Sequence, residues 1–222
     1  MWIKENYKSI LITTILLLIF YGFALQIVLF TPEVIHKYIF SEQGPYESLS
    51  PLLWLLLAIF SLCHSYFRIS TRLVMASAAV LFALREWDLH KALFGTSFIK
   101  SRYYFNPEIP VMHKIGGALI LAFILYLAIY LLVQYFKALK VQIKEPSRAF
   151  RYMNLALVLL VISKVLDRMS SQMVELFHVR LSAQTELIIW VLEESTEMLL
   201  PTMFLVAIIL HSYKYKSKVN TR

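Results

Sequence analysis

The sequence predicts an all-α integral membrane protein, built as a bundle of six transmembrane helices with both termini in the cytoplasm. Hydrophobic residues make up 59% of the 222 positions and charged residues 16%, whereas soluble domains have roughly 45–50% and about 25%. The mean hydropathy is +0.65, and several apolar runs are long enough for a hydrocarbon core of about 30 Å. This composition excludes an ordinary soluble enzyme and a disordered chain. The length suits one membrane domain over residues 1–222.

Three helices are predicted from apolar runs without interruption. Residues 9–30 contain no charged side chain, and residues 115–136 are equally apolar. Residues 48–67 form a third run, with Pro51 in the first turn, where proline is tolerated.

Three further helices are predicted although charged residues interrupt their runs. They are 73–94, 151–172 and 187–210. Residues 73–84 of the first and 152–163 of the second form about three largely apolar turns before the charged residues Arg85 and Lys164. The last reaches Glu193 after six apolar residues. These apolar halves are too long to be surface stripes of soluble helices, so we expect all three to cross the membrane.

The basic residues set the expected orientation, because cytoplasmic loops carry an excess of Lys and Arg. With the N-terminus inside, the inner set holds 13 basic residues against only Glu5 and Glu145. The orientation of the spans in the membrane therefore explains the formal net charge of +8. No nucleic-acid partner is expected. We expect a multi-pass protein of a bacterial cytoplasmic membrane. A signal peptidase site after Ala24 is the alternative for the first run, and cleavage there would leave the other five helices unchanged.

The charged residues inside the helices share one depth. At 1.5 Å per residue, Arg85 and Lys164 lie about 18 Å from the inner edge, and Glu197 lies about 15 Å from the outer edge. A charge at the bilayer centre costs about 2.5–3.5 kcal/mol on insertion scales. We therefore expect a buried polar layer in the outer half of the membrane, in which Arg85 and Arg168 contact the glutamates of the last helix, or Asp88 and Asp167.

The spacing of these residues predicts shared helix faces. Glu86 and His90 are four residues apart, as are Glu193 and Glu197. Pro201 removes a backbone hydrogen bond to the Glu197 carbonyl. A stripe is also expected along the fifth helix, formed by Ser163, Lys164, Asp167, Arg168 and Ser171.

One hypothesis for this layer is a metal-assisted hydrolase or transferase that acts on a lipid-linked substrate. Carboxylates and imidazole suit Zn, Mn or Fe, although the sequence does not identify the metal. The candidate catalytic residues are Glu86, Asp88, His90, Glu194 and Glu197. The candidate substrate-binding residues are Arg85, Lys164, Asp167, Arg168 and Glu47. The candidate metal ligands are Glu86, His90, Glu193 and Glu197.

Three other hypotheses stay open. The layer could be a structural salt-bridge network, a proton or cation pathway, or the contact surface for another membrane protein. A continuous relay for a pathway is not visible, because the inner halves of the third, fifth and sixth predicted helices are almost uncharged and the inner histidines, His64 and His211, lie near the inner ends. The loop 95–114 combines aromatic and basic residues, which favours a connector in the headgroup layer or a lid over the polar layer. Membrane lipids are the expected partners in every case.

Overall fold

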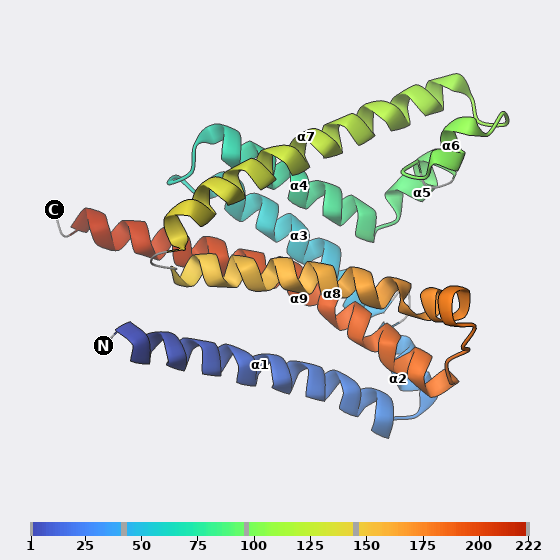
Figure 1. Ribbon diagram of the computed structural model, residues 1–222, viewed down its shortest axis with the longest axis horizontal. Helices are drawn as coiled ribbons and strands as arrows, with labels where there is room; N and C mark the ends of the chain where they lie inside the picture. Colours follow the sequence, from blue (N-terminus) through green and yellow to red (C-terminus); the bar gives the residue numbers. More distant parts are fainter. Residues whose placement is uncertain (1, 41–43, 96–97, 144–146, 221–222) are drawn as a thin grey trace. The chain divides into compact units, whose positions relative to one another are not determined.

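The computed structural model describes residues 2–40, 44–95, 98–143 and 147–220; within these ranges the side chains of 2–10, 33, 36–37, 90–92 and 214–220 are not described. This part of the chain is helical, with no strand (Figure 1). The helices are α1 Trp2–Phe30, α2 Glu33–Phe40, α3 Pro45–Cys63, α4 Ile69–Glu86, α5 Leu89–Phe94, α6 Ser101–Phe105, α7 Val111–Gln142, α8 Arg148–Phe177 and α9 Ala183–Asn220. The predicted all-α class is therefore confirmed.

Five segments are long and apolar enough to cross a membrane, and one of them runs across residues 41–43, which lie outside the described residues. They are Leu11–Phe30, Tyr38–Cys63, Val111–Gln142, Arg148–Phe177 and Ala183–Tyr213. They correspond to five of the six predicted spans, and four of them extend beyond at least one of the predicted ends. A multi-pass membrane protein is compatible with these helices. The six-span count and the orientation stay predictions.

The predicted single helix over 73–94 is wrong. The chain leaves the helix after Glu86 and enters α5 only at Leu89. Asp88 has φ +51°, in the left-handed region that aspartate tolerates better than most residues. The Trp87 N–H donates to the Ala83 carbonyl, and the Asp88 N–H donates to the Arg85 carbonyl. These bonds close the last turn of α4, as at many helix ends. Helical periodicity in the sequence did not predict this local cap.

The contacts divide the chain into two compact units. The first contains Met1–Ser50 and Arg148–Ala207, and the second contains Pro51–Ser147 and Ile208–Arg222. The single membrane domain over residues 1–222 stays a prediction. The polar residues of each unit are described separately.

In the first unit, α1 and α2 pack against α9 around a small apolar core. Ala24, Val28, Phe40 and Val191 are each at most 6% exposed. Two hydroxyl hydrogen bonds add polar links, one between Tyr21 and Thr196 at 2.8 Å. The other joins Thr13 of α1 to Tyr152 of α8 at 2.6 Å. In a membrane, a hydrogen bond between two helices gives each hydroxyl a partner that the lipid acyl chains cannot provide.

In the second unit, α4 packs along α7 in the opposite direction. The Tyr130 hydroxyl of α7 lies 3.0 Å from the Thr71 hydroxyl, in the first turn of α4. At the C-terminal end of α4, the chain continues into α5. The ring of Phe94, the last residue of α5, lies beside Gly116 in the second turn of α7. Trp54 of α3 stacks on Phe82 of α4 with ring centroids 4.4 Å apart. Aromatic packing therefore joins α3 to the α4–α7 pair.

Candidate functional site

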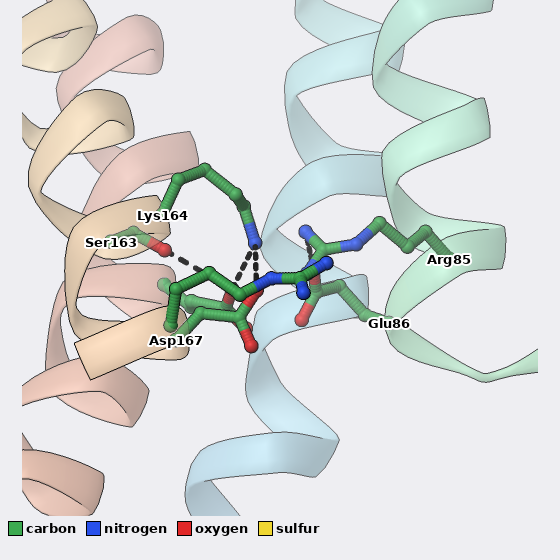
Figure 2. A network of polar contacts seen from close by, with 7 residues as sticks. Arg85, Glu86, Ser163, Lys164 and Asp167 are labelled. Atoms are coloured by element: carbon green, nitrogen blue, oxygen red, sulfur yellow. Dashed lines mark hydrogen bonds and ion pairs between the residues drawn. The ribbon is translucent and has the colours of Figure 1, made fainter. Parts of the chain in front are cut away.

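The polar cluster of the first unit forms where α8 passes α9. Lys164 donates to Glu197 Oε1 at 3.3 Å, and the Ser163 hydroxyl donates to the same oxygen at 3.1 Å. Lys164 also lies 3.6 Å from Asp167 Oδ2, and Arg168 Nε lies 4.0 Å from that oxygen. Figure 2 shows Ser163, Lys164 and Asp167 on adjacent turns of α8, with Lys164 pointing toward the carboxylates. The predicted stripe on this helix is confirmed for these four α8 residues.

The members of this cluster differ in exposure. The Glu197 side chain is 12% exposed, whereas Lys164 is 43%, Asp167 is 40% and Arg168 is 67% exposed. Ser163 is fully buried. One carboxylate is therefore enclosed, and the two cations present part of their surface outward. An apolar setting strengthens the attraction between such charges and makes an unpaired charge costly.

The neighbouring α9 residues are partly or fully buried. Glu193 and Glu194 are half-buried, and Ser195 and Thr196 are at most 1% exposed. Thr196 also donates to the Leu192 carbonyl in its own helix. Pro201 lies inside α9, as the sequence predicted, so no N–H at that position bonds the Glu197 carbonyl.

Glu47 lies in the first turn of α3, within the first unit. Carboxylates are favourable at that end of a helix. The role of Glu47 in substrate binding stays a prediction.

The second unit has its own ion pair, formed by residues adjacent in sequence. Arg85 donates to Glu86 Oε1 at 3.2 Å, and Glu86 is 8% exposed at its side chain. Figure 2 shows this pair on α4. The predicted shared face of Glu86 and His90 is wrong, because the helix breaks between them. Asp88 is exposed and lies outside the helix, so it does not share the helix face that its spacing of three residues from Arg85 predicts. The His90 side chain is outside the described residues.

A metal site is not visible among the described side chains, where no group of three or more His, Cys, Asp and Glu comes together. Of the candidate ligands, Glu86 and His90 belong to the second unit, and Glu193 and Glu197 belong to the first. The predicted ligand set therefore stays a prediction. The chemistry that the described geometry offers is that of ion pairs and hydroxyl groups.

Comparison with known proteins adds no assignment. No family model, no curated protein and no solved structure matches this chain.

A polar contact that sequence reasoning missed lies in the second unit. His211 Nδ1 of α9 lies 3.2 Å from Nε2 of His64, which directly follows α3. Phe67 stacks on both rings, with centroid distances of 4.3 and 4.4 Å. Burial lowers the pKa of His64 below 6.5, backbone hydrogen bonds oppose this effect, and the nearby charge of Arg72 adds to it. The signal in the sequence that bears on this contact is common depth, because both histidines are predicted near inner helix ends.

Proposed function

We propose that this protein is a hydrolase or transferase of the cytoplasmic membrane, acting on a lipid-linked substrate with an anionic head group. The α8–α9 cluster is the proposed site. The observation that carries the proposal is the enclosed Glu197 carboxylate beside cations that are partly exposed in otherwise apolar helices. Charges at such positions are costly and are typical of functional sites in membrane proteins.

The roles follow from charge and exposure. Arg168, the most exposed member, would hold a phosphate or carboxylate by paired N–H donors. Glu197 would accept the proton of an attacking water, and Lys164 would return a proton to the departing alkoxide. In this step water forms a bond to the ester carbon or phosphorus, the bond to the leaving oxygen breaks, and the products are an acid and an alcohol.

The metal-assisted form of this proposal would place Zn, Mn or Fe at the α8–α9 cluster, with Glu193 and Glu197 among the ligands. Carboxylate and imidazole donors support that choice of metals. Elemental analysis of the purified full chain tests it. A value near one metal per chain, lost in Glu193→Ala and Glu197→Ala, supports the metal, and metal-free protein with intact activity removes it.

A second candidate function is a structural ion-pair network. The observation that favours it is that one Glu197 oxygen accepts from both Ser163 and Lys164, which ties α8 to α9. Buried charge networks fix helix register in some proteins, although they add little net stability.

Complementation of a gene deletion separates these candidates. The readouts are the lipid composition of the cells and the thermal stability of the purified variants. We expect Glu197→Gln to fold and insert normally while failing to restore the lipid composition. Glu186→Gln is the matched control, because Glu186 is an exposed carboxylate in the first turn of the same helix. Full complementation by Glu197→Gln would remove its charge from any mechanism and leave the structural role.

A further inference from the structure

The segment that leads into α7 is fixed to that helix by buried aromatic side chains. Phe98 and Tyr103 are 4% and 3% exposed. A Cβ placed on Gly117 of α7 would lie 3.1 Å from Phe98 Cβ and 3.4 Å from Tyr103 Cε1. The Phe94 ring lies 5.1 Å from Phe98 and 6.2 Å from His113, measured between centroids. This aromatic packing makes the segment a structured part of the second unit and not a free loop.

Other side chains of the same segment point away from this packing. Large apolar side chains are exposed there, with Phe105 at 84%, Met112 at 78%, Val111 at 68% and Ile99 at 60%. Lys100 and Arg102 are also exposed, and they lie between Ile99 and Phe105 along the chain. We call these six residues the 99–112 face.

The position of the 99–112 face favours one occupant. Val111 is also the first residue of the candidate span Val111–Gln142, so the face lies at the end of an apolar helix. At the boundary between headgroups and acyl chains, apolar side chains of a protein contact the acyl chains, and its cationic side chains contact the lipid phosphates. Exposed aromatic and aliphatic groups beside Lys and Arg are complementary to both.

We propose that the 99–112 face binds anionic phospholipid, with its apolar side chains at the acyl boundary and Lys100 and Arg102 against the phosphates. The proposal is independent of the reaction proposed for the α8–α9 cluster. A lid over a polar site or a contact with another protein would instead leave this face without preference for anionic lipid.

The test uses the full chain in nanodiscs of phosphatidylcholine, with and without phosphatidylglycerol. In a Cys63→Ser background, Phe105→Cys carries an environment-sensitive fluorophore. We expect quenching by lipids brominated on the acyl chain and protection from aqueous iodide. We also expect phosphatidylglycerol to be enriched around the protein, and Lys100→Gln with Arg102→Gln to reduce this enrichment several-fold, since basic residues near an anionic surface attract it.

The control is Lys137→Gln with Lys140→Gln, near the other end of α7, which should leave the fluorescence at position 105 unchanged. All of the substituted residues at the 99–112 face are exposed, so the variants should fold. Iodide quenching without bromolipid quenching would overturn the proposal. So would enrichment of phosphatidylglycerol that persists when Lys100 and Arg102 are neutralised.

Discussion

Lys164 Nζ lies 3.3 Å from Glu197 Oε1, and this ion pair joins α8 to α9 in the middle of two apolar helices. The two partners are unequal, because Glu197 is largely enclosed and Lys164 is partly exposed. Removing the lysine therefore leaves a buried charge, whereas neutralising the glutamate leaves an amine that can reach a more polar surrounding.

The first prediction follows from this inequality. Lys164→Met should lower the free energy of unfolding by about 1–3 kcal/mol, because the enclosed Glu197 carboxylate loses the hydrogen bond and the positive charge of the lysine. Glu197→Gln should cost less, because the amide still accepts from Ser163. Thermal unfolding in detergent measures both variants. In the double variant, the loss should be smaller than the sum of the single losses. Strictly additive losses would mean that the two side chains do not interact in the folded protein.

The second prediction concerns pH and the His64–His211 contact. Burial, the largest cause, holds the pKa of His64 below its ordinary 6.5. The unfolded chain therefore binds a proton more readily than the folded chain just below pH 6.5. Stability should be fully present above about pH 6.5 and should fall as the pH drops toward the lower folded pKa.

Thermal unfolding of the wild type and of His64→Gln across this pH range tests the second prediction. The glutamine variant should lose most of the stability change between neutral and mildly acidic pH. Groups facing His64, including His211 and Arg72, remain in that variant and serve as an internal control. An unchanged pH slope in His64→Gln would assign the titration to another group.

The sequence predicted the helices well and the polar contacts only in part. Apolar length and charge spacing are properties of single helices, so α8 and its Lys164–Asp167 contact followed from periodicity. The end of α4 did not follow from periodicity. The charged residues keep their helical spacing past Glu86, although the left-handed backbone at Asp88 ends the helix there. The His64–His211 contact depends on which helices are neighbours, and no single-helix pattern contains that information. The sequence signal for such a contact is a common depth of the two residues in the membrane. The predictions from depth concern only the charged residues in the outer half of the membrane.

The third prediction separates the backbone role of Asp88 from any role of its charge. Asp88→Asn should keep the fold, because asparagine also tolerates φ +51°. Asp88→Val should lose about 1–2 kcal/mol, the cost of the left-handed region for a side chain of that kind. Thermal unfolding ranks the two variants. Equal stability of Asn and Val at this position would show that the backbone strain is absent.

The fourth prediction tests the expected orientation. With both termini inside, a cysteine at position 144 should be protected from an impermeant thiol reagent in intact cells. A cysteine at position 101 should react. Both are introduced with Cys63→Ser, since the native cysteine is exposed. The count of basic residues motivates the expectation. Labelling at position 144 without permeabilisation would reverse the proposed topology.

The fifth prediction compares two adjacent glycines in α7, whose substitution by alanine should have opposite effects. A Cβ on Gly116 would meet its nearest neighbour, the Phe94 ring, at 3.7 Å, an ordinary contact. Gly116→Ala should therefore stabilise the protein by about 0.4–1 kcal/mol, because alanine reduces the freedom of the unfolded chain.

A Cβ on Gly117 would lie 3.1 Å from Phe98 Cβ, an atom fixed to the backbone of the adjoining segment. Gly117→Ala should displace that segment and cost about 1–3 kcal/mol, as overpacking of a core usually does. Thermal unfolding gives the sign of each change, and proteolysis between residues 98 and 104 should accelerate in Gly117→Ala alone. Stabilisation by both substitutions would mean that the aromatic side chains do not pack against α7 at Gly117.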